Sequence, residues 1–167
     1  RAYEARMRKR ERQEGTLAAQ RAARAARLEA TLDNRIALLK RELASRGLTV
    51  QRAQRFPVNA ANLMMTIVVP QNGRYKLVVV APPGAMTSAS VLVNIGTSLF
   101  NIGAKSTPSY DCKMVANEGS CWINFSTPVK TPRPGGTVTY TMLVQPSSVR
   151  GAVMSPPVYV AVVRYGD

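Results

Sequence analysis

The residue types that carry chemistry are sparse in this chain. Its 167 residues include no His, so the sequence offers no Ser-His or Cys-His pair and none of the common metal-ligand clusters. Beyond residue 57 the carboxylates are Asp111, Glu118 and Asp167. Asp111 and Glu118 flank one expected hairpin, but a glycosidase also needs a cleft and substrate-facing aromatic side chains. The sequence therefore predicts two solvated turn residues, no catalytic, metal or cofactor site, and no enzyme.

Two cysteines, Cys112 and Cys121, lie nine residues apart on either side of the turn residues Asn117-Glu118-Gly119. If they face each other on adjacent strands, a disulfide would stabilise the fold by about 2–3 kcal/mol. The alternative is two small buried apolar side chains. The spacing excludes a Cys-x-x-Cys metal or redox site.

Positive charge is concentrated at the N-terminal end. The net charge is +14, and residues 1–57 hold 15 Lys/Arg against 6 Asp/Glu, whereas residues 58–167 hold 8 against 3. A basic helix can bind nucleic acid or an anionic surface. The alternative, which we favour from the sequence alone, is a solvated helix whose neighbours in an assembly are acidic.

The chain changes character once, between Gly47 and Pro57. Before this junction it is charged and rich in Ala and Arg, and after it come Val/Ile/Thr/Tyr runs separated by Gly, Pro, Asn and Ser. We expect a helical stalk over residues 1–47, a linker over 48–57 and a β head over 58–167. No apolar run reaches transmembrane length. Because the chain begins at Arg1, we also expect it to be processed or part of a longer polypeptide.

The stalk shows a coiled-coil spacing that is strongest at Leu32, Ile36, Leu39 and Leu43. A lone helix has nothing to pack this apolar stripe against, so we expect several copies to share it as an oligomerisation seam. The alternative is an amphipathic helix packed on its own head. Gly47 is expected to end the helix in the left-handed conformation.

The head reads as about eight antiparallel strands, which predicts a β-sandwich or jelly roll. Asn72-Gly73 predicts a tight hairpin. The runs 67–69 and 77–80 are apolar on both faces, which predicts that one face meets the core and the other a subunit interface. The alternative is a central hairpin that lies beneath a loop. The expected strands are Leu63–Val69, Arg74–Ala81, Ala89–Ile95, Ser98–Ile102, Cys112–Val115, Cys121–Thr127, Thr137–Val144 and Val158–Arg164.

Four segments of the head resemble a known group of proteins. They are GRYKLVV at 73–79, VLVNIG at 91–96, PGGTVTY at 134–140 and PVYVAVVRYG at 157–166. Their order resembles that of trimeric jelly-roll heads, namely bacteriophage fibre tips and the tumour-necrosis-factor-like and complement-type heads. The resemblance covers roughly residues 63–166 and implies a homotrimer in which the stalk leads into the head. No binding residue can be transferred, because such heads vary where they bind.

These observations favour a structural virion protein: an oligomeric phage fibre or appendage subunit, located in the virus particle. Its expected partners are itself, as a homotrimer, other virion proteins through the N-terminal helix, and a cell-surface glycan or protein. The alternatives are a jelly-roll coat protein with a basic arm that faces nucleic acid, and a carbohydrate-binding module. Trp122 is expected in a core or interface rather than stacked on a sugar. The candidate contact loops contain Pro82, Pro83, Thr87, Lys105, Tyr110 and Arg150.

Overall fold

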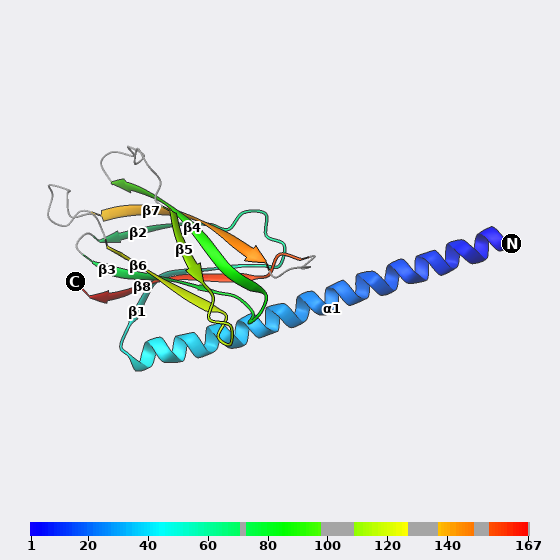
Figure 1. Ribbon diagram of the computed structural model, residues 1–167, viewed down its shortest axis with the longest axis horizontal. Coiled ribbons are helices and arrows are strands. Elements are labelled where there is room, and N and C mark those ends of the chain that lie inside the picture. Colours follow the sequence, from blue (N-terminus) through cyan, green and yellow to red (C-terminus); the bar gives the residue numbers. More distant parts are fainter. Residues whose placement is uncertain (71–72, 98–108, 127–136, 149–153, 167) are drawn as a thin grey trace.

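The computed structural model describes residues 1–70, 73–97, 109–126, 137–148 and 154–166. Within them, one long helix precedes eight strands that form two four-stranded antiparallel sheets (Figure 1). The elements are α1 (Ala2–Ser45), β1 (Thr49–Phe56), β2 (Met64–Pro70), β3 (Arg74–Val80), β4 (Met86–Thr97), β5 (Ser109–Lys113), β6 (Ser120–Ser126), β7 (Thr137–Ser148) and β8 (Val158–Gly166).

The two sheets are arranged as a jelly roll. One sheet, called the covered sheet here, has the strand order β1-β8-β3-β6, and the second sheet has the order β2-β7-β4-β5. Among consecutive strands only β4 and β5 share a sheet, so the chain repeatedly crosses the sandwich, as in a double-sheet jelly roll. The predicted β-sandwich is therefore confirmed. The prediction of a tight hairpin at Asn72-Gly73 was wrong, because β2 and β3 do not pair with each other: β2 pairs with β7, and β3 pairs with β6 and β8.

The prediction of a linker over residues 48–57 was also wrong, because most of this segment forms strand β1. This strand pairs with β8 from Thr49 opposite Arg164 to Phe56 opposite Val158. It lies at the edge of the covered sheet, where its polar side chains meet solvent, and Phe56 is its one buried residue. The other predicted strands overlap observed ones, apart from Ser98–Ile102, which lies outside the described residues.

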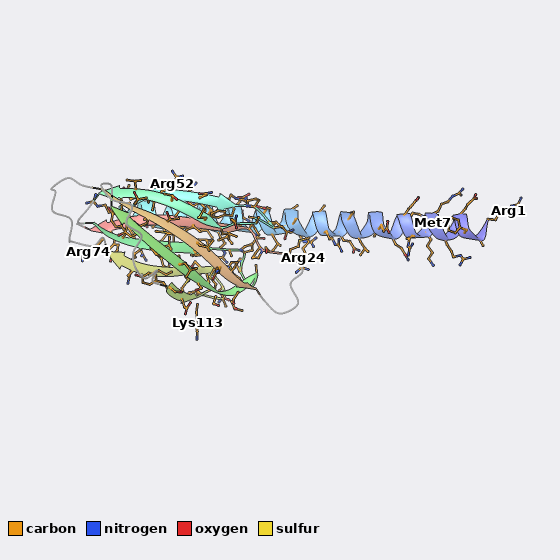
Figure 2. The ribbon with its side chains drawn as sticks, turned by 90° about the horizontal axis from the view of Figure 1, so that it is seen from above. Arg1, Met7, Arg24, Arg52, Arg74 and Lys113 are labelled. Carbon is orange, nitrogen blue, oxygen red and sulfur yellow. A yellow bond between two sulfur atoms is a disulfide. The ribbon has the colours of Figure 1, made fainter. Side chains whose placement is uncertain are left out.

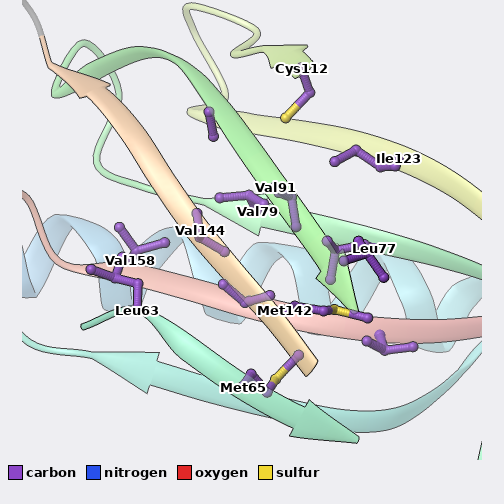
Figure 3. Close-up of a cluster of buried hydrophobic side chains, with 14 of the residues drawn as sticks. Leu63, Met65, Leu77, Val79, Val91, Cys112, Ile123, Met142, Val144 and Val158 are labelled. Carbon is purple, nitrogen blue, oxygen red and sulfur yellow. The ribbon is translucent and has the colours of Figure 1, made fainter. Parts of the chain in front are cut away.

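The main core lies between the two sheets (Figure 3). It takes alternate residues of each strand, such as Leu77 and Val79 from β3 and Met142 and Val144 from β7. Strand β7 shows this alternation where its side chains are described: Tyr140, Met142 and Val144 are buried, whereas Thr139 and Thr141 are only partly buried.

A second core lies on the opposite face of the covered sheet, beneath the C-terminal half of α1. The sheet contributes alternate residues of its two central strands, and the helix contributes its apolar stripe. Both faces of β3 and β8 are thus buried, one by the second sheet and one by the helix. The buried residues of this second core are Leu32, Ile36, Leu39, Leu43, Val78, Val80, Tyr159, Ala161 and Val163.

This packing corrects the expectation that the stripe needs a second copy of the chain. Leu32 is fully buried and Leu43 is 3% exposed within a single chain. The alternative, a helix packed on its own head, is what the structure shows. The prediction for β3 was right about burial on both faces, but the second cover is the chain's own helix. On β2 one face stays open, since Val68 is 59% exposed.

The helix ends in a Schellman motif. The Leu48 N–H donates to the Leu43 carbonyl over 3.0 Å, and the Gly47 N–H donates to the Ala44 carbonyl over 3.1 Å. Gly47 has φ of +66°, as the sequence predicted. Leu48 also packs on the second core, so the motif turns the chain directly from the helix into β1.

Replacing Gly47 by Ala should lower the free energy of unfolding by about 1 kcal/mol, because an L side chain is strained at positive φ. Urea denaturation followed by circular dichroism measures this loss. Gly15→Ala is the matched control: an added Cβ there meets nothing within 4 Å, and Ala favours helix by about 1 kcal/mol. Equal losses in the two variants would contradict the cap.

Leu32→Ala should lower the free energy of unfolding by about 2–5 kcal/mol, because it opens a cavity under the helix. Leu38→Ala is the control, since Leu38 is 49% exposed on the same helix; its effect should stay within about 0.5 kcal/mol. Because the stripe is covered within one chain, the loss caused by Leu32→Ala should be the same at every protein concentration. A loss that grows with concentration would instead place the stripe between copies.

Candidate functional site

The residues that could do acid–base chemistry are not brought together. Asp111 is exposed on β5 and Glu118 is exposed in the turn before β6. The Ser120 hydroxyl donates to Glu118 over 3.5 Å. Within the described residues, no group of three or more His, Cys, Asp or Glu side chains could hold a metal ion. Both carboxylates are exposed, as predicted, but Asp111 lies in a strand rather than in a turn.

Two tyrosines have a shifted pKa, and burial explains both shifts. Burial in the main core raises the pKa of Tyr140 above its ordinary 10.0, and the nearby Tyr75 and Tyr110 act in the same direction. Burial beneath the helix likewise raises the pKa of Tyr159. Burial therefore keeps both phenols neutral up to a higher pH than a solvated tyrosine.

Cys112 and Cys121 form a disulfide with a Cα–Cα distance of 5.8 Å. Cys112 lies on β5 of the second sheet and Cys121 on β6 of the covered sheet, so the bond joins the two layers rather than two neighbouring strands. The turn between them reaches the helix, because the Arg35 guanidinium donates to the Asn117 carbonyl. The disulfide therefore holds the sandwich closed next to the docked helix.

Replacing both cysteines by Ala should lower the free energy of unfolding by about 2–3 kcal/mol, because the disulfide closes a short loop in the unfolded chain. Wild type and the double variant are each measured with and without a reducing agent. Reduction should destabilise wild type and leave the stability of the double variant unchanged. Equal stability of oxidised wild type and the variant would contradict a closed disulfide.

The predicted contact loops do not form one described surface. Pro82 is buried and Pro83 is partly buried, and Gly119 of the turn before β6 lies close to Pro83. Thr87 belongs to β4, and Tyr110 belongs to β5 and packs against the main core. Lys105 and Arg150 lie outside the described residues. Trp122, by contrast, is partly buried against the helix, in agreement with its expected place in a core or interface.

The structure instead isolates the first part of α1, residues 1–24, as an exposed arm. Every residue of the arm is exposed, and Figure 1 shows it running past the end of the sandwich. At about 1.5 Å per residue the arm extends roughly 35 Å. It holds eight Lys/Arg against three Asp/Glu. The arm is thus a positively charged rod whose surface the sandwich leaves free.

Ion pairs at the docked half of the helix fix where the arm leaves the sandwich. Arg55 of β1 pairs with Glu29 and, over 3.0 Å, with Asp33. Glu29 also accepts the Val58 N–H over 2.8 Å. By contrast, no arm residue forms an ion pair within the described part of the chain. The cations of the arm therefore remain available for an external anion.

The sequence indicated the arm's charge and its contact with solvent, but not where the arm begins. Its residues Ala18 and Ala22 continue the spacing of the apolar stripe into the arm. In the structure the buried part begins at Leu32, and both of these alanines are exposed. The drop from Leu and Ile to Ala was the signal that separates the docked half from the arm, because Ala buries little apolar area.

The chain is similar to several solved structures but to no known protein family. No protein-family model matches the chain, and no curated protein gives a significant sequence match. Similar solved structures include a chain of Broad Bean Stain Virus, with 9% identity, a TM-score of 0.42, and coverage of 69% of this chain and 41% of that one. The structure of TmCBM61 in complex with β-1,4-galactotriose has 8% identity and a TM-score of 0.37. The match covers 72% of this chain and 87% of that one.

A third similar structure is the enzymatically active domain of tailspike protein 4 of bacteriophage CBA120. It has 13% identity, a TM-score of 0.36, and coverage of 71% of this chain and 19% of that one. The chain spans about two fifths of the length of the Broad Bean Stain Virus chain. All three likenesses have TM-scores below 0.5, and no residue role follows from them. Among the described residues, the one helix is too polar to cross a membrane.

Proposed function

We propose that this chain is a structural subunit of a virus particle, in which the jelly roll forms the shell and the arm contacts the packaged nucleic acid. The observation that carries the proposal is the arm itself: residues 1–24 are exposed, hold eight Lys/Arg against three Asp/Glu, and form no ion pair within the described residues. A rod of this charge attracts a phosphate backbone with little regard to sequence.

The sandwich supports a structural role rather than a catalytic one. Double-sheet jelly rolls are used by viral capsid and lectin domains. The described part of this one carries no clustered acid–base residues and no metal-ligand group, and a disulfide ties its two layers together. Such a rigid, closed block suits repeated packing against copies of itself. The docked half of the helix would then set the direction in which the arm leaves the shell.

A second candidate is the fibre or appendage subunit, because apolar side chains are exposed on the arm. Tyr3 is 69% exposed, Met7 36% and Leu17 51%. At 100° per residue these three lie within about 80° of one another on the helix. They would form the contact if arms of neighbouring copies, as in the expected homotrimer, packed together into a stem. A dependence of arm helicity on protein concentration would favour this candidate.

The proposal predicts salt-dependent binding of single-stranded RNA by the full chain. A fluorescently labelled oligonucleotide of about 20 residues should bind at about 50 mM salt and weaken steeply towards about 200 mM. The arm variant R8Q/K9Q/R10Q should reduce the slope of log affinity against log salt by about 2, since each lost phosphate contact removes about 0.7 for single strands. Fluorescence anisotropy measures both quantities.

The control variant is K40Q/R41Q/R52Q, which removes three exposed cations outside the arm. It has the same net charge as the arm variant and should keep nearly the wild-type slope. Electron microscopy of chain mixed with long RNA should show particles with wild type and the control, and fewer with the arm variant. Absence of RNA binding by wild type at low salt would remove the proposal.

A further inference from the structure

A groove lies where the arm leaves the sandwich. It has a volume of about 650 Å³ and is lined by residues of both parts of the chain: Leu17, Gln20, Arg21, Arg24, Arg27, Asn59 and Met154. Figure 2 shows Arg24 at this exit point, with Met7 and Arg1 farther out along the arm. The volume falls in the range of about 300–1,000 Å³ that is typical of small-ligand sites.

The charge of the groove comes from three arginines at intervals of three residues. Arg21, Arg24 and Arg27 are exposed and form no ion pair within the described residues, and none of the described lining residues is acidic. Successive members rise about 4.5 Å along the helix. Guanidinium groups bind phosphate oxygens through paired hydrogen bonds. The row therefore fits a chain of phosphates rather than one isolated anion.

The rest of the groove suits the other parts of a nucleotide. Leu17 and Met154 offer apolar surface, one from the helix and one from the residues that precede β8. The Asn59 Oδ1 accepts the Ser155 N–H over 2.9 Å, which leaves the amide NH₂ as the donor available to a ligand. Gln20 adds a second side-chain amide. Apolar surface, amides and arginines together are what an unstacked base and its phosphate need.

From this arrangement we infer that the groove binds a nucleotide of a single-stranded nucleic acid, with its phosphates on Arg21, Arg24 and Arg27 and its base against Leu17 and Met154. The inference rests on the proposed function and names where the strand is held. A double helix does not fit this arrangement, because its bases are stacked inside and cannot reach the apolar surface.

The groove variant R21Q/R24Q/R27Q tests the inference beside the arm variant and the control described above. At about 50 mM salt we expect the groove variant to bind a 5′-labelled uridine oligonucleotide of about 12 residues at least tenfold more weakly than the control, with a salt slope lower by about 2. An abasic oligonucleotide of equal length should bind wild type more weakly than the uridine one, because the base contact is lost.

A second measurement needs no variant. Phenylglyoxal modifies accessible arginines, and mass spectrometry then reports each position. The uridine oligonucleotide should protect Arg21, Arg24 and Arg27, whereas Arg41 and Arg52, which are exposed away from the groove, should react as they do without it.

The outcomes separate the two proposals. Suppose that wild type binds the oligonucleotide and the arm variant binds it more weakly. If the groove variant then binds like the control, and the oligonucleotide does not protect Arg21, Arg24 and Arg27, the groove is overturned and the proposed function stands. If wild type does not bind at low salt, both fall. Equal binding of the abasic and uridine oligonucleotides would overturn the base contact to Leu17 and Met154.

Discussion

The packing of the helix stripe on the covered sheet determines most of this structure. The central strands β3 and β8 are apolar on both faces, so the jelly roll alone would leave Val78, Val80, Ala161 and Val163 in water. The stripe from Leu32 to Leu43 removes that surface from solvent. Each buried Leu or Ile contributes about 1.5–3 kcal/mol of hydrophobic free energy before entropy is counted. The C-terminal half of the helix therefore shares a core with the sandwich.

Several polar contacts follow from this packing and make it directional. Arg55 forms ion pairs with Glu29 and Asp33, and the turn between β5 and β6 accepts a hydrogen bond from Arg35. The Schellman motif at Gly47 leads directly into β1. Most of these polar groups are partly exposed, so each pair adds little free energy. Their role is to select one register of the helix on the sheet. That register decides which arginines face the sandwich at the point where the arm leaves it.

The sequence predicted the strands well and their connections poorly. Alternation of apolar and polar residues depends on local burial, so strands such as β7 could be read directly from Val138 to Val144. Strand β1 was missed because, as a solvated edge strand rich in Arg and Gln, it lacks an apolar pattern. The hairpin at Asn72-Gly73 failed for another reason. A turn motif reports local geometry, whereas a jelly roll sends the chain to the opposite sheet at that point.

The arm's helicity depends on the same packing. Starting an isolated helix in water is unfavourable, because its first turn is costly to form. Here the docked half supplies that first turn, and Ala and Arg, both good helix formers, extend the helix outward from it. Burying the arm on the sheet would remove many cations from water, which is costly, and would bury little apolar surface beyond alanine methyl groups. The arm is therefore more stable in solvent. Docking of the C-terminal half therefore keeps Arg21, Arg24 and Arg27 at helical spacing beside the rim of the sandwich.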